Sequence, residues 1–148
     1  MNFIRTYRLY FAFMVALIAT VGSLSFSEIF GFVPCELCWF QRVLMYPLVF
    51  LLLIAIFKRD PNIDIYILPF TILGIIVSGY HILVQRLEFF QENSSCNIGV
   101  PCNAIYIEWF GFLTIPVMSF IAFLLITLFC VSQKSIEFRK KHMQSYRN

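Results

Sequence analysis

Charged residues are scarce in this chain. Only 13% of its 148 residues are Asp, Glu, Lys or Arg, and the formal net charge is +3. No basic tract favours a nucleic acid as partner. Hydrophobic residues make up 60% of the chain, above the roughly 45–50% typical of soluble domains, and the mean hydropathy is +0.82. This composition excludes an ordinary soluble domain and predicts a protein of the lipid bilayer.

Polar stretches long enough to form a second domain are also missing. Four apolar stretches approach the ~20 residues that a helix needs to cross roughly 30 Å of hydrocarbon; they cover about 9–27, 39–57, 65–84 and 109–131. The second stretch is short if it is started at Val43, but Cys38, Trp39 and Phe40 can extend it outward as an interfacial turn. No connecting segment is long enough for a second domain. We therefore expect an all-α membrane protein, with residues 1–148 forming one four-transmembrane-helix bundle.

Basic residues are distributed unequally between the two faces of this bundle. Cytoplasmic segments of membrane proteins carry an excess of Lys and Arg. The segments 28–42 and 85–108 hold only Arg42 and Arg86, and the other face holds the remaining nine: Arg5, Arg8, Lys58, Arg59, Lys134, Arg139, Lys140, Lys141 and Arg147. The distribution predicts cytoplasmic termini and two extracytoplasmic loops, 28–42 and 85–108.

The first apolar stretch has an alternative interpretation as a cleaved signal peptide, because Arg5 and Arg8 resemble a basic n-region. Its apolar run is longer than the usual 7–15 residues of such a peptide, and no clear A-x-A cleavage site follows it. We expect this stretch to be a retained helix.

The predicted topology separates the five cysteines into two groups. Cys35, Cys38, Cys96 and Cys102 fall in the extracytoplasmic loops, where an oxidising compartment allows disulfides to persist. Cys130 falls near the inner end of the fourth span, on the order of 30 Å away at 1.5 Å per helical residue. It is expected to be a small buried apolar residue.

The first pair forms a C-x-x-C motif at the outer, N-terminal end of the second span. Unpaired N–H groups and the helix dipole stabilise a thiolate at this position, and Cys38 is the better candidate for it. Arg42 follows Cys38 by four residues, so a helix would place both side chains on one face. The alternative role for Arg42 is that of a headgroup anchor.

The second pair, Cys96 and Cys102, is separated by five residues that include Gly99 and Pro101. These turn formers could bring the two Cα atoms within disulfide distance. The bond would be either exchangeable with a soluble partner or an inert staple. A zinc site made of all four thiolates is a further alternative, but the five-residue spacer and the oxidising compartment disfavour it.

His81 lies near the outer end of the third span, at about the expected depth of Cys38 and Arg42. An ionisable residue at membrane depth is a functional candidate. Its alternative role is an interhelical hydrogen bond.

Several of these features occur together in one known family. The chain resembles the DsbB/BdbC family of bacterial disulfide bond formation proteins, and most of all its Gram-positive BdbC branch, from about Tyr7 to Val131. The resemblance rests on Cys35-x-x-Cys38-Trp39-Phe40-Gln41-Arg42, Tyr46-Pro47, the second outer pair and Leu113-Thr114-Ile115-Pro116.

The resemblance implies a quinone-dependent thiol oxidoreductase of the bacterial cell membrane. Such proteins reoxidise an extracytoplasmic thioredoxin-like (DsbA/BdbD-type) disulfide donor and pass its electrons to a membrane quinone, menaquinone or ubiquinone, without a metal. Carried over by position, the resemblance implies that the partner attacks Cys96 and that Cys102 then exchanges with Cys35. It further implies that Cys38 contacts the quinone, with Arg42 beside it, and His81 is the additional candidate for quinone contact.

One departure from the family pattern is the short spacer between Cys96 and Cys102, since well-known Gram-negative members have a longer loop there. Two alternatives to the enzyme remain at this point. One is a non-catalytic membrane scaffold with structural disulfides. The other is a vitamin K epoxide reductase-like protein, in which the second pair would be expected ahead of the C-x-x-C motif.

Overall fold

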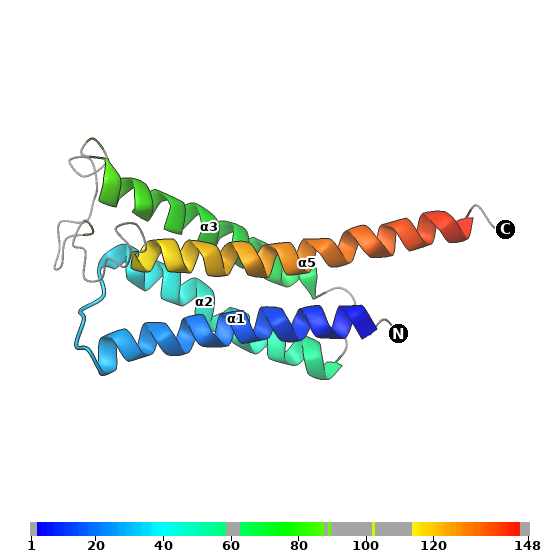
Figure 1. Cartoon of the computed structure of the whole chain (residues 1–148), viewed down its shortest axis with the longest axis horizontal. Helices are drawn as coiled ribbons and strands as arrows, with labels where there is room; N and C mark the ends of the chain where they lie inside the picture. The colour runs from blue at the N-terminus through cyan, green and yellow to red at the C-terminus, as the bar shows by residue number, and fades with distance from the viewer. Residues whose placement is uncertain (1–2, 59–62, 88, 90–101, 103–113, 146–148) are drawn as a thin grey trace.

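The computed structural model describes residues 3–58, 63–87, 89, 102 and 114–145, and the side chains of these residues between Tyr7 and Val131. The described chain forms α1 (Phe3–Glu28), α2 (Glu36–Lys58), α3 (Asp64–Arg86) and α5 (Ile115–Ser145) (Figure 1). The expectation of an all-α fold is confirmed.

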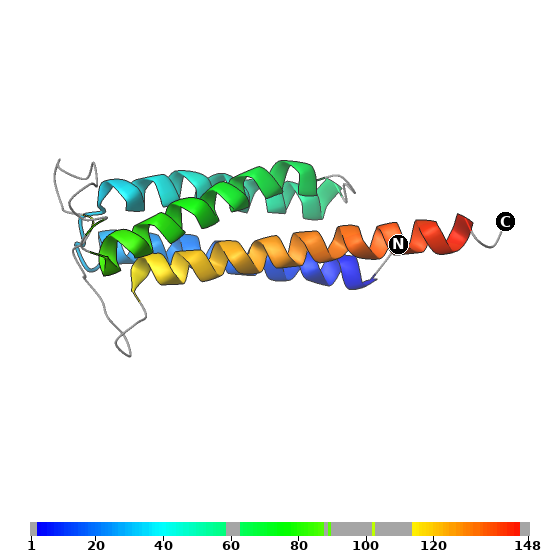
Figure 2. The same cartoon turned by 90° about the horizontal axis from the view of Figure 1, so that it is seen from above.

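The four helices pack as a ring in which each helix makes its main contacts with two others. Helices α1 and α3 both pack against α2 and α5, as the two perpendicular views show (Figures 1 and 2). The start of α1 and the end of α5 lie at the same end of the bundle, whereas α2 begins and α3 ends at the opposite end. Cys35 and Cys38, the cysteines of the C-x-x-C motif, therefore lie at the end of the bundle opposite to both termini.

Within the described residues, three helices are long and apolar enough to cross a membrane, namely Tyr7–Glu28, Glu36–Lys58 and Asp64–Arg86. Helix α5 contributes a shorter apolar segment, Ile115–Val131. The first part of the predicted fourth span, 109–113, lies outside the described residues, as does most of the loop 85–108. The number of spans therefore stays a prediction.

Most apolar side chains of these helices face outward. Only 17–33% of the most apolar window of each long helix is buried within the chain, and large side chains such as Ile18, Phe50 and Phe57 are exposed. Such a surface would be costly in water but suits hydrocarbon, where the backbone is satisfied within each helix.

The packing between α3 and α5 depends on one glycine. A Cβ atom added at Gly74 would overlap the ring of Phe123, which is completely buried. The absence of a side chain at Gly74 thus allows the two helices to approach closely, as small residues do in membrane bundles.

The connection between α1 and α2 positions the C-x-x-C motif. Gly31 adopts a positive φ of 67°, a conformation that costs glycine little, and the chain then runs to Cys35 and enters α2 at Glu36. The helix begins three residues before the predicted start at 39, so Cys38 lies within its first turn. Pro47 lies inside this helix without ending it.

Candidate active site

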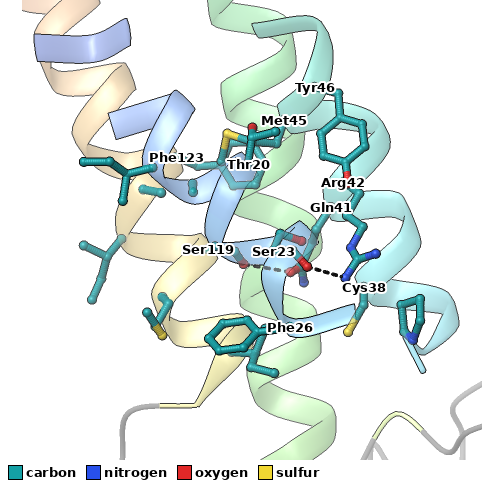
Figure 3. A pocket seen from close by; sticks show the side chains of 18 of the residues that line it. Thr20, Ser23, Phe26, Cys38, Gln41, Arg42, Met45, Tyr46, Ser119 and Phe123 are labelled. Atoms are coloured by element: carbon teal, nitrogen blue, oxygen red, sulfur yellow. Dashed lines mark hydrogen bonds between the residues drawn. The ribbon is translucent and has the colours of Figure 1, made fainter. Parts of the chain in front are cut away.

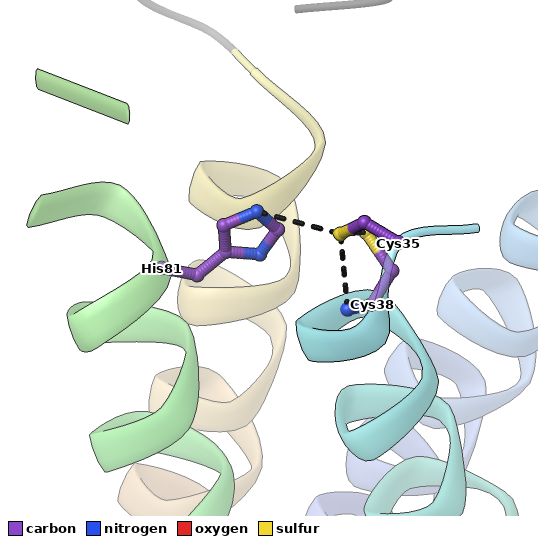
Figure 4. A group of neighbouring side chains, drawn as sticks. All are labelled: Cys35, Cys38 and His81. Atoms are coloured by element: carbon purple, nitrogen blue, oxygen red, sulfur yellow. Dashed lines mark hydrogen bonds between the residues drawn. The ribbon is translucent and has the colours of Figure 1, made fainter. Parts of the chain in front are cut away.

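The two cysteines of the C-x-x-C motif form a close dithiol. Cys35 immediately precedes α2, and its Sγ lies 2.8 Å from the Sγ of Cys38 (Figure 4). The backbone N–H of Cys38 also donates to the Sγ of Cys35, at 3.4 Å. Both are free thiols. Because a disulfide has an S–S distance of about 2.05 Å, only a small movement of either side chain is needed for the two sulfurs to bond when an acceptor removes two electrons and two protons.

A buried histidine from α3 faces this dithiol. The Nε2 of His81 lies 3.7 Å from the Sγ of Cys35 and 3.1 Å from the carbonyl oxygen of Cys102. The ring is only 1% exposed. The interhelical role considered for His81 is therefore present, and one of its partners is a cysteine of the motif.

A chain of hydrogen bonds orients the ring of His81. The hydroxyl of Ser119 on α5 donates to Oε1 of Gln41, at 2.7 Å, and Nε2 of Gln41 lies 3.1 Å from Nδ1 of His81. With the amide donating, Nδ1 is an acceptor and the ring proton is on Nε2. That proton points toward the carbonyl of Cys102 and the sulfur of Cys35.

This environment favours the thiolate form of Cys35. The hydrogen bond from the thiol of Cys38 is the largest cause, and together with His81 it outweighs the opposing effect of burial and lowers the pKa of Cys35 to about 4, from an ordinary value of 9.0. The sequence pointed to Cys38 as the thiolate. The structure favours Cys35 because the thiol of Cys38 donates to it and because His81, 46 positions away in the chain, lies 3.7 Å from its sulfur.

Arg42 joins α2 to the end of α1. Its Nη2 donates to the carbonyl oxygen of Ser23, at 2.8 Å, and to the hydroxyl of Ser27, at 2.5 Å. Carbonyls at a helix C-terminus attract a cation, so α1 holds the guanidinium in place. Arg42 lies on the same side of α2 as Cys38, as their spacing predicted, and both line one cavity.

That cavity has a volume of about 350 Å³ and lies between α1, α2 and α5 (Figure 3). Its wall is mostly apolar, with a few polar groups. The described lining residues on the three helices are Val15, Ile18, Ala19, Thr20, Gly22, Ser23, Phe26, Cys38, Gln41, Arg42, Met45, Tyr46, Ile115, Met118, Ser119, Ile121, Ala122, Phe123 and Leu125, with Phe32, Val33 and Pro34 from the preceding connection.

Two polar features of the cavity were not anticipated. The hydroxyl of Thr20 is buried and has no hydrogen-bond partner among the described residues, which is unusual for a buried polar atom. Gln41 is buried within an apolar helix, a polar exception that sequence reasoning could have flagged. No residue of α3 lines the cavity in the described part of the chain. His81 is linked to the cavity by its contacts with Gln41 and with the dithiol.

The second cysteine pair is described only in part. Cys102 is disulfide-bonded and 2% exposed, and it belongs to the same small apolar cluster as Cys35 and Val84. Cys96 lies outside the described residues. Cys130 is a free, buried residue of the main core, which confirms its predicted role as a small apolar residue.

Comparison with known proteins identifies a family and several relatives of the chain. The chain matches the family described as Disulfide bond formation protein DsbB over residues 5–133. It is 53% identical over 121 residues to Disulfide bond formation protein C of Bacillus subtilis (strain 168), covering 82% of this chain and 88% of that protein.

Two further relatives are also similar over at least three quarters of each chain. The chain is 44% identical over 128 residues to Probable disulfide formation protein C 2 of Bacillus cereus (strain ATCC 10987 / NRS 248), covering 86% of this chain and 91% of that protein. It is 48% identical over 112 residues to Probable disulfide formation protein of Oceanobacillus iheyensis, covering 75% of this chain and 77% of that protein. No solved structure matches the chain.

Proposed function

The chain belongs to the DsbB family of disulfide bond formation proteins, and from this premise we propose that it reoxidises an extracytoplasmic thioredoxin-like disulfide donor and passes the electrons to a membrane quinone. Membership of the family implies a multi-pass membrane protein with thiol–disulfide oxidoreductase activity. The quinone, the partner and the side of the membrane are the parts that we propose.

The position of Cys38 is the observation that carries this proposal. Its sulfur is in contact with that of Cys35, and the same residue lines the cavity between α1, α2 and α5. Cys38 is therefore the point at which a dithiol meets an apolar cavity. A two-electron transfer from the thiols to an acceptor in that cavity needs no other side chain as intermediary.

The cavity fits the head of a quinone. Small-molecule sites are mostly apolar, have volumes of roughly 300–1,000 Å³ and contain a few polar groups that orient the ligand. Here the unpartnered hydroxyl of Thr20 and the fixed guanidinium of Arg42 would hydrogen-bond to the carbonyl oxygens. A bound quinone supplies the acceptor for two electrons and two protons, so that one dithiol and one quinone become one disulfide and one hydroquinone.

The residues of the dithiol have separate tasks in this scheme. Cys35 exchanges with Cys102, which belongs to the same apolar cluster, and His81 stabilises Cys35 as a thiolate leaving group. Cys38 delivers the electrons to the acceptor, and Arg42 stabilises negative charge that develops beside it. Cys96 is the proposed point of attack by the partner.

We also propose that the dithiol faces the extracytoplasmic side. The motif lies at the end of the bundle opposite to the start of α1 and the end of α5 (Figure 1). Nine of the eleven basic residues belong to the face that carries the termini, which favours that face as cytoplasmic. A donor protein outside the cytoplasm could then reach the second loop.

The test is quinone reduction by a reduced thioredoxin-like partner, catalysed by the purified protein in detergent. Cys38→Ser should abolish turnover while the protein still folds and inserts, and Cys130→Ser, in the core far from the motif, should retain it. Retained turnover in Cys38→Ser would overturn the enzyme proposed here and favour a scaffold with structural disulfides.

The topology has its own test. After reduction of intact cells, a membrane-impermeant maleimide should label Cys96 and Cys102 from outside, whereas Cys130 should stay unlabelled. Labelling of the two loop cysteines only after the inner face is opened would reverse the proposed orientation.

A further inference from the structure

We propose that Cys35, Cys38 and His81 form a binding site for a thiophilic divalent cation, Zn²⁺, and that the occupied site withholds the reduced dithiol from disulfide formation. The two sulfurs and a ring nitrogen of His81 all lie within 4.8 Å of one another (Figure 4). The ligand set contains one histidine and two thiolates, and it differs from the four-thiolate site considered from the sequence.

The distances are close to those of a tetrahedral zinc site. With Zn–S of about 2.3 Å and Zn–N of about 2.0–2.1 Å, the ligand atoms are separated by about 3.6 Å for S and N and about 3.8 Å for the two sulfurs. The Sγ of Cys35 already lies 3.7 Å from Nε2 of His81. The sulfurs, at 2.8 Å, must separate by about 1 Å, which a rotation of the half-buried Cys38 side chain supplies.

Charge selects the ion. Two thiolates and one neutral imidazole neutralise a divalent cation, and a neutral complex has the smallest desolvation cost at a buried position. Sulfur ligands disfavour Mg²⁺ and Ca²⁺, which prefer oxygen. A monovalent soft ion would leave an uncompensated negative charge in the same place.

The hydrogen bonds behind His81 can adapt to a metal. A metal on Nε2 requires the ring proton to be on Nδ1, where it needs an acceptor. If the amide of Gln41 turns over, Oε1 accepts that proton and Nε2 donates to the hydroxyl of Ser119. That hydroxyl can then donate to the carbonyl oxygen of Pro116, at 3.0 Å. The same side chains thus satisfy the ring with and without a metal.

The fourth coordination position would be filled by water or by the carbonyl oxygen of Cys102, which lies 3.1 Å from Nε2 of His81. Binding moves no electrons: each thiol that is still protonated releases its proton to water, and Zn–S bonds replace the S–H bonds. A Cys35–Cys38 disulfide has no thiolate to offer. The site therefore exists only in the reduced protein.

A cadmium titration tests the proposal. The protein carries Cys96→Ser, Cys102→Ser and Cys130→Ser, so that Cys35 and Cys38 are the only thiols, and Cd²⁺ is the probe because its thiolate complexes absorb in the ultraviolet. The reduced protein should bind one Cd²⁺ that Zn²⁺ displaces, and the oxidised protein should bind none. The absence of the thiolate–cadmium band from the reduced protein would overturn the proposal.

The histidine ligand has a separate control. His81→Ala should weaken Cd²⁺ binding at least tenfold, since even outer partners of metal ligands contribute about 10–100-fold, whereas His142→Ala, at the only other histidine, should not. Equal affinity in a folded His81→Ala protein would overturn the site.

A measurement on the unmutated His81 keeps the test independent of the variant's folding. Zinc X-ray absorption of the reduced complex should show two sulfur ligands and at least one nitrogen; a spectrum without sulfur, or with sulfur alone, would contradict the site. None of these experiments contains a quinone or a partner protein. Their failure would leave the proposed oxidoreductase intact, and failure of the turnover assay would not affect the metal site.

Discussion

The Nε2 atom of His81 lies 3.7 Å from the sulfur of Cys35, although the two residues are separated by 46 positions. One precedes α2, and the other belongs to the last turns of α3. The reactivity of the dithiol therefore depends on how α3 packs against α2, in addition to the position of the motif at a helix start.

The first prediction concerns the reactivity of Cys35. Its pKa is lowered from 9.0 to about 4, so the thiolate is present at any pH well above 4 and disappears as the pH falls through that value. In the reduced protein, the alkylation rate of Cys35 by iodoacetamide should be nearly constant from about pH 8 to pH 5 and fall near pH 4. Peptide mass spectrometry measures the rate.

Two variants separate the causes of this low pKa. Because the hydrogen bond from Cys38 is the largest cause, Cys38→Ala should move the midpoint furthest toward the ordinary value, and His81→Ala should move it less. A midpoint near 9 in the unaltered protein would contradict the assignment of Cys35 as the thiolate.

The second prediction concerns Arg42 and the cavity. Arg42→Ala removes the guanidinium from the cavity wall, and the KM for quinone should rise between about 10- and 100-fold, since a hydrogen bond to a charged group is worth roughly 1.5–3 kcal/mol. Steady-state kinetics at varied quinone concentration measures it. Ser27→Ala removes one partner of Arg42 but keeps the cation, so it should change KM much less. An unchanged KM in Arg42→Ala would show that Arg42 only links α2 to α1 through its hydrogen bonds and takes no part in quinone binding.

The third prediction concerns the hydroxyl of Thr20, which has no hydrogen-bond partner in the described part of the chain. Thr20→Val keeps the shape and removes the hydroxyl, so the ligand-free protein should be more stable by about 1 kcal/mol, because a buried unsatisfied polar group costs roughly 1–3 kcal/mol. The KM for quinone should rise at the same time. Thermal unfolding and kinetics of one preparation measure both.

The matched control for Thr20 is Thr127→Val on α5. The hydroxyl of Thr127 donates to the carbonyl of Phe123 and does not line the cavity, so its loss should leave KM unchanged. If Thr20→Val raised stability with no effect on KM, the hydroxyl would have no part in quinone binding.

The fourth prediction concerns the packing of α3 against α5. Gly74→Ala would place a Cβ atom against the ring of Phe123, and such overpacking costs about 1–3 kcal/mol. At Gly79, by contrast, an added Cβ would meet Phe120 at an ordinary contact distance of 3.7 Å, so Gly79→Ala should be neutral or slightly stabilising. Unfolding temperatures in detergent compare the two, and equal effects would contradict the close approach at Gly74.

The parts of the molecule that depend on local sequence could be predicted. The apolar runs indicated the helices, and the four-residue spacing of Cys38 and Arg42 indicated that both lie on one side of α2. The family resemblance rested on this local motif together with Tyr46-Pro47, the second cysteine pair and Leu113-Thr114-Ile115-Pro116. The assignment of the chain to the DsbB family is confirmed.

The parts that depend on contacts between helices could not be predicted. A helix start favours a thiolate at Cys38, but the sequence does not show that the thiol of Cys38 and the ring of His81 both stabilise the thiolate of Cys35. Ser119 is an ordinary small residue of α5 until its bond to Gln41 is seen. Thr20 lies in an apolar run, and nothing nearby in the chain marks its hydroxyl as unpartnered.

The two faces of α2 have an evolutionary consequence. The thiol cluster draws on α2, α3 and Cys102, whereas the cavity draws on α1, α2 and α5. If the cavity holds the electron acceptor as proposed, substitutions in α1 would change the acceptor site without disturbing the contacts of His81. Exchange of α1 between relatives from organisms with different respiratory chains is a direct route to such a change of acceptor.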